Sequence, residues 1–166
     1  MLCYARNSAC SLFWKLHLLL GKDVNQPEQV LRKMLSRNPR WISGHKALAT
    51  IALQNGNTKL AYCAAHCFLS LAMRDKDKAL ALSMLAQCYT ASGNASVALN
   101  YFEKSCAIFP PDIETKEHIA AAHILAQDFK EAEQLLTSIG EKHLTPQAKA
   151  ALKFAKSKLQ TSNQTL

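Results

Sequence analysis

Apolar residues recur along most of this chain at intervals of three and four positions, which is the period of amphipathic helices. Glycine and proline interrupt the pattern about every 12 to 20 residues, and no alternating runs of valine, isoleucine and threonine lie between them. The pattern therefore predicts an all-α chain without a sheet. It predicts helices over residues 7–20, 27–38, 41–54, 57–73, 77–91, 95–108, 112–126, 129–139 and 146–160.

The stretch from Leu82 to Pro110 holds a more specific arrangement. Its spacing is that of a helix, a tight turn and a second, antiparallel helix, with small residues where the two cross. The residues that carry this spacing are Leu82, Leu85, Ala86, Tyr89, Gly93, Ala98, Phe102 and Pro110. The stretch resembles one tetratricopeptide (TPR) repeat, although Leu82 stands where that family often has Trp and Ala86 where it often has Gly.

The same features recur on both sides of this stretch. A downstream copy follows at the period of the TPR family, with Gln127 at the turn and with Ile119, Ala120, Ala132 and Leu136 at the matching small and apolar positions. An upstream copy has Gly56 at the turn and Leu48, Ala49 and Ala61 at the matching positions. Gly56 and Gly93 are farther apart than Gly93 and Gln127, which predicts about one extra helical turn. We expect this turn in the second helix of the upstream unit.

These copies predict a single domain over residues 1–166. Its repeats are expected at about 7–40, 41–77, 78–112 and 113–145, and the first of them is degenerate. By the resemblance, the fold is an all-α, TPR-like solenoid of antiparallel helix pairs that winds into a right-handed superhelix. Residues 146–160 are predicted to form a C-terminal capping helix, because an open solenoid leaves the apolar face of its last repeat in water.

An apolar run at residues 11–20 has features in common with a signal peptide. Lys15 and His17 interrupt the run, no small-residue cleavage site follows it, and it is too short to span a bilayer. We therefore expect it to be the buried first helix of the array, with no transmembrane segment. An interfacial helix and a chain cut from a larger protein are the alternatives. Without a secretion signal, the expected location is the cytoplasm, where the six cysteines would stay reduced.

Three side chains of types that bind metal ions lie within one turn of a predicted helix. Cys63, His66 and Cys67 share one face of a helix, and Cys88 or Cys106 could add a fourth ligand for zinc. Their spacing matches no established zinc signature. We favour packing of small thiol side chains at a helix crossing, and predict neither a metal nor another cofactor.

The chain holds no Gly-rich phosphate loop, no Gly-x-Ser-x-Gly elbow and no His-Glu-x-x-His helix. His118 and His123 lie near Glu117 in one predicted helix, yet their spacing along that helix does not place them well on a common face. The sequence therefore predicts that the chain is not an enzyme.

The net charge of +8 is unevenly distributed. Residues 1–50 hold eight Lys or Arg against two acidic residues, a surplus of six. The surplus concentrates in a basic patch formed by Arg32, Lys33, Arg37 and Arg40. Such a patch could attract an acidic peptide, a nucleic acid backbone or an anionic membrane. A solvated helix face is the favoured interpretation, because the patch lacks the interleaved aromatic residues of single-strand binders.

In TPR proteins the concave surface, lined mainly by the first helix of each pair, usually grips a peptide. Carrying this over by position predicts a groove lined by Lys46, Thr50, Gln54, Ser83, Gln87, Thr90, Glu117 and Ala121. The resemblance thus implies a non-catalytic scaffold that binds a protein or peptide segment. The family's clamp for chaperone C-termini is disfavoured, because only Lys15 matches it.

Two other functions remain open at this point. The basic N-terminal half could belong to a helical repeat that binds RNA or another anion. The chain could also be an accessory TPR segment of a larger enzyme or of a secretion or assembly system. The identity of the partner, the pathway and homo-oligomerisation are left open as well.

Overall fold

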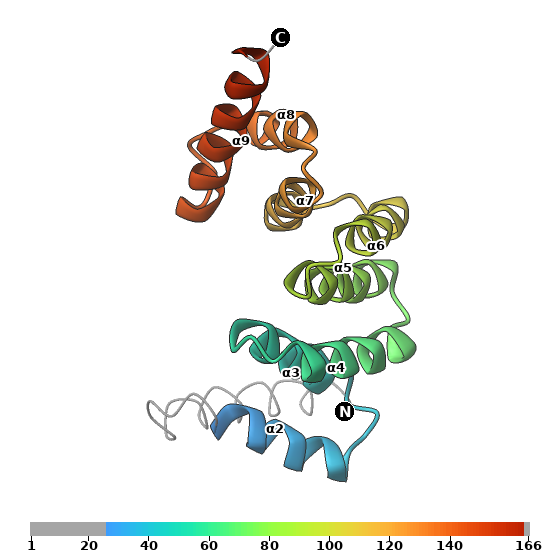
Figure 1. Ribbon diagram of the computed structural model, residues 1–166. Helices are drawn as coiled ribbons and strands as arrows, with labels where there is room; N and C mark the ends of the chain where they lie inside the picture. Colours follow the sequence, from blue (N-terminus) through green and yellow to red (C-terminus); the bar gives the residue numbers. More distant parts are fainter. Residues whose placement is uncertain (1–25, 165–166) are drawn as a thin grey trace.

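The computed structural model describes residues 26–164, and these fold into helices without any strand (Figure 1). This confirms the all-α prediction for the described part of the chain. The predicted helix at 7–20 lies outside the described residues. The helices are α2 (Gln26–Arg37), α3 (Ile42–Gln54), α4 (Thr58–Leu71), α5 (Asp75–Ala91), α6 (Ala95–Ile108), α7 (Ile113–Leu125), α8 (Phe129–Ile139) and α9 (Pro146–Gln164).

The helices form a curved row in chain order, from α2 at one end to α9 at the other (Figure 1). Each helix packs against the next, and α3, α5, α7 and α9 also contact one another in series. Only short turns connect α3 with α4, α5 with α6, and α7 with α8, so the two helices of each pair run antiparallel. The row therefore has one layer made of the first helices of successive pairs.

The three turns within these pairs share one backbone geometry. The residue at the turn has a positive φ in each, at Gly56 (71°), Gly93 (81°) and Gln127 (66°). At each turn, the next residue donates its N–H to a carbonyl five positions back, over 2.8 to 2.9 Å. The turn residue itself donates to a carbonyl three positions back, over 3.0 to 3.1 Å. This pair of bonds is the Schellman motif, which satisfies carbonyls at a helix end. The predicted turn positions are thus confirmed.

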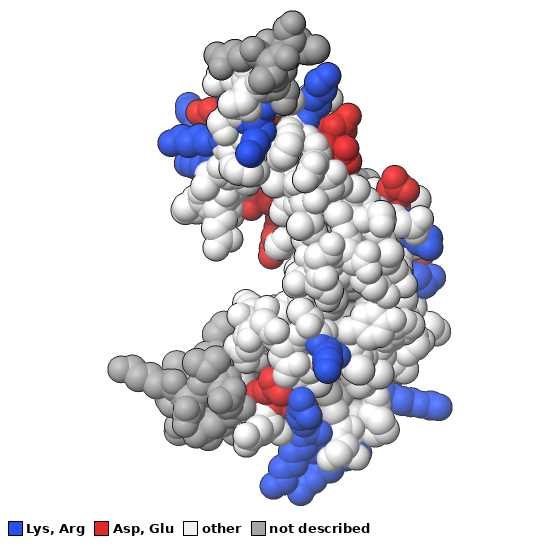
Figure 2. Space-filling view, in the orientation of Figure 1, with Lys and Arg blue, Asp and Glu red and all other residues white. Residues whose placement is uncertain are grey.

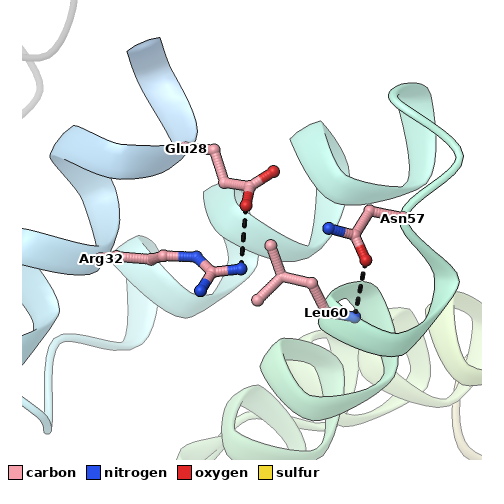
Figure 3. A network of polar contacts seen from close by, with 4 residues as sticks. All are labelled: Glu28, Arg32, Asn57 and Leu60. Carbon is pink, nitrogen blue, oxygen red and sulfur yellow. Dashed lines mark hydrogen bonds and ion pairs between the residues drawn. The ribbon is translucent and has the colours of Figure 1, made fainter. Parts of the chain in front are cut away.

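The first of these turns also starts the next helix. The side chain of Asn57 accepts a hydrogen bond from the N–H of Leu60 over 3.3 Å, as Figure 3 shows. Asn57 therefore ends the Schellman motif of α3 and caps the N-terminus of α4.

Small buried residues recur at matching positions of the helix pairs. Six alanines that the repeat pattern placed at matching positions are all completely buried, at 0% exposure. They are Ala49, Ala86 and Ala120 on the first helices and Ala61, Ala98 and Ala132 on the second. Because alanine lacks side-chain atoms beyond Cβ, two helices can approach closely at these points.

The extra helical turn is present, but not where the sequence analysis placed it. Helices α4 and α6 both have 14 residues, so the second helix of the upstream unit is not extended. Instead, α5 has 17 residues, whereas α3 and α7 have 13 each. The added turn begins at Asp75, where two acidic residues in the first turn favour the helix N-terminus. The prediction of a longer second helix was therefore wrong.

Replacement of Gln127 by glycine is expected to raise the free energy of unfolding by up to about 1 kcal/mol, because a side chain disfavours the positive φ at this turn. The reverse change, Gly93→Ala, is the matched control. A Cβ there would meet nothing within 4 Å, so its expected cost of about 1 kcal/mol is a backbone effect alone. Urea unfolding measures both. A loss of stability in Gln127→Gly would contradict the equivalence of the turns.

Candidate functional site

A groove of about 820 Å³ runs along the layer formed by α3, α5 and α7. Its floor comes from α3 between Lys46 and Gln54, from α5 between Lys76 and Gln87 and from the first half of α7, and the connection between α6 and α7 forms a wall. Gln147 of α9 also lines it. Figure 2 shows that the molecule is hollowed between α9 and the end of the row that holds α3. The groove is the candidate site, because several helices and a loop meet there.

Five of the eight predicted groove residues line this groove: Lys46, Thr50, Gln54, Ser83 and Gln87. The other three, Thr90, Glu117 and Ala121, are not among its lining residues. The hydroxyl of Thr90 donates to the carbonyl of Ala86 over 3.0 Å.

Glu117 has a different position from the one that the repeat register suggests. One of its carboxylate oxygens accepts the N–H of Thr145 over 2.8 Å, and the other accepts the Thr145 hydroxyl over 2.9 Å. The same threonine oxygen accepts the N–H of Ala148 over 3.2 Å in the first turn of α9. Glu117 therefore ties the start of α9 to α7.

Sequence reasoning missed the wall of the groove and part of its floor. Phe109 and Pro110 belong to the α6–α7 connection, and no repeat position marked them as lining residues. His118 could have been found, because it occupies in its repeat the position of Met84 in the repeat before it, and both line the groove. Lys76 lines it as well, and it lies in the extra turn at the start of α5.

One buried hydroxyl on the floor has no hydrogen-bond partner. Ser83 is 2% exposed, and its Oγ forms no hydrogen bond with the described residues. A helical serine usually donates to the carbonyl three or four residues before it. Here the carbonyl of Ala79 accepts the hydroxyl of Ser105 from α6 over 2.7 Å. The Ser83 hydroxyl is thus left unpaired and buried beneath the floor of the groove, at a cost of about 1–3 kcal/mol for an unpaired buried group.

The charged residues of the groove are distributed by helix. Lys46 lies on α3 and Lys76 at the start of α5, whereas Asp112 and Glu114 lie at the start of α7. Asp112 caps α7 by accepting the N–H of Thr115 over 2.9 Å. This bond, the Thr115 hydroxyl and the positive charge of Lys76 lower the pKa of Asp112. Asp112 is therefore ionised at neutral pH.

The cysteine cluster lies away from this groove. Cys63, His66 and Cys67 are exposed on α4, so the interpretation that these thiols pack at a helix crossing was wrong. Cys63 lines a separate shallow pocket of about 420 Å³ with Cys88. Burial raises the pKa of the Cys88 thiol to about 11, so this thiol is protonated at neutral pH. Among residues 26–164, no group of three or more His, Cys, Asp or Glu side chains is placed to hold a metal ion.

Two histidines on α7 contact carboxylates. His118 Nε2 lies 4.0 Å from Glu114, and His123 Nδ1 lies 3.7 Å from Asp128. Nucleophilic catalysis also requires a hydroxyl or thiol within hydrogen-bond distance of such a base. Within the described residues, neither histidine has a hydrogen bond to a hydroxyl or thiol.

The basic patch lies on α2 and just after it, and all four of its side chains are exposed. Arg32 forms an ion pair of 2.9 Å with Glu28, which Figure 3 shows. Figure 2 shows basic side chains over α2 at one end of the row and over α9 at the other. No described helix is both long enough and apolar enough to cross a membrane.

No model of a protein family matches the chain, and no curated protein is significantly similar to it. The resemblance to TPR repeats rests on the internal repeat and stays a prediction.

Proposed function

We propose that the chain is a TPR-like scaffold, a right-handed superhelix of helix pairs that binds an extended segment of another protein in the groove along α3, α5 and α7. It acts without catalysis, in a reducing compartment such as the cytoplasm. Three observations support the TPR-like fold: the repeated Schellman turns, the buried alanines at the positions that the repeat pattern marks and the series of contacts between first helices.

The observation that carries the binding proposal is the composition of the groove. It runs along α3, α5 and α7, the first helices of three successive pairs, and the uncharged polar side chains of Thr50, Gln54 and Gln87 line it on α3 and α5. Side chains of this kind can donate to and accept from the N–H and C=O groups of an extended backbone. Met84 and Phe109 add apolar surface for the side chains of such a segment.

A photo-crosslinking amino acid placed at Gln87 tests this proposal in cells. We expect it to capture partner proteins, because Gln87 lines the groove. The matched control is the same amino acid at Gln134, which is exposed on α8 and is not a lining residue. Equal capture from both positions, or capture from position 134 alone, would show that the groove is not the binding surface.

A second candidate function is anion binding by the basic patch. It is favoured by the exposure of Arg32, Lys33, Arg37 and Arg40 at one end of the row. This function ranks lower, because Arg32 is already paired with Glu28 and phosphate contacts alone give binding without sequence preference.

A further inference from the structure

The charges along the groove suggest what kind of segment it accepts, an inference that rests on the function proposed above. Helices α3, α5 and α7 follow one another along the row, as Figure 1 shows and as their contacts confirm. A segment that lies along the groove therefore meets Lys46 on α3 first and the acidic residues of α7 last.

Two of the four charges, Lys76 and Asp112, act on each other. Lys76 is near enough to Asp112 for its positive charge to lower the pKa of this carboxyl, and Asp112 is also used as the cap of α7. The other two charges, on Lys46 and Glu114, are more available to pair with a bound segment. Lys46 is exposed and forms no ion pair with the described residues, and the side chain of Glu114 is 85% exposed, with only His118 at 4.0 Å.

The distance between these two charges follows from helix packing. Packed helices lie about 8–10 Å apart, so the two steps from α3 to α7 span about 16–20 Å. An extended chain rises about 3.3 Å per residue. Five or six residues cover this span, and the length of the Lys46 and Glu114 side chains extends the usable range to about seven.

Between the two charges, uncharged side chains line the groove, both polar (Thr50, Gln54 and Gln87) and apolar (Leu53, Leu80 and Met84). The Ser83 hydroxyl, buried and without a partner in the described structure, can both donate and accept. Thr50 and Gln87 line the groove on neighbouring helices. A charged residue at this central position would be desolvated against groups that carry no opposite charge, which disfavours it.

We propose that the groove selects an extended polypeptide segment with an acidic residue that meets Lys46 and a basic residue that meets Glu114. The two charges are five to seven residues apart, with uncharged residues between them. A segment with charges of one sign fits less well, because it meets a like charge at one end of the groove.

Panning of a phage-displayed library of random twelve-residue peptides on the full chain tests this proposal. The informative clones are those whose capture is lost on the Gln87→Arg variant, since they occupy the groove. Among them we expect acidic and basic residues at a separation of five to seven to be enriched over the unselected library. Groove-dependent clones without this enrichment would overturn the charge pattern and leave the proposed function intact. If no clone depends on Gln87, both proposals fail.

A charge exchange provides the second measurement. In a synthetic selected peptide, replacing the acidic residue by lysine is expected to weaken binding to the natural chain by about tenfold or more. The same peptide should regain affinity on the Lys46→Glu variant. The matched control is Lys130→Glu, at an exposed position of α8 outside the groove, where no recovery is expected. Recovery on both variants, or on neither, would contradict the contact with Lys46.

Discussion

The Phe102→Ala variant is expected to lose about 3–5 kcal/mol of unfolding free energy, the range for a large side chain removed from a packed core. Phe102 is 2% exposed and packs in a cluster with Ala86, Ala98 and Ala122. These residues come from α5, α6 and α7, so the ring fills the space where two successive helix pairs meet. Truncation would leave a cavity at this joint. Urea unfolding followed by circular dichroism measures the loss.

The control for this variant is Phe109→Ala. Phe109 is 42% exposed and follows α6 directly, so its truncation should cost less than about 1 kcal/mol. The two changes remove the same atoms and differ in burial. Similar unfolding midpoints for the two variants would contradict the packing of Phe102 between the pairs.

The sequence was sufficient to predict the helices within residues 26–164 and the turns inside the pairs, because the signals involved are local. A turn residue with a positive φ and an alanine at a crossing are required at the same place in every pair, so they recur at a fixed period. Gln127 illustrates the strength of this argument. It is not a glycine, yet the period alone assigns it to a turn, and its φ is 66°.

The groove could be predicted only in part, because its shape depends on how one helix pair is rotated against the next. Glu117 and Ser83 occupy matching positions of successive repeats, but Ser83 lines the groove whereas Glu117 bonds to Thr145 before α9. No period in the sequence encodes this difference. The free hydroxyl of Ser83 was also beyond sequence reasoning, since it depends on a hydrogen bond from Ser105 on another helix.

A comparison of groove and patch variants at two salt concentrations separates the two candidate functions. The double variant Thr50→Arg and Gln87→Arg is expected to weaken binding of a groove-selected peptide by about 100-fold or more, because bulky cations would fill the floor. Ser83 is left unchanged in this design, since a charged side chain at a position with 2% exposure would unfold the chain.

The matched change at the basic patch is Lys33→Gln, Arg37→Gln and Arg40→Gln, with Arg32 retained because it pairs with Glu28. If the groove is the binding surface, this variant should bind the peptide less than about tenfold more weakly, and the difference should shrink as salt rises, because the three side chains are exposed and their fields are screened. An anion-binding protein would show the opposite result with a single-stranded RNA probe: steep loss of affinity with salt, and near-complete loss in the patch variant. RNA binding that survives the groove change and disappears with the patch change would identify the basic patch, and not the groove, as the binding surface.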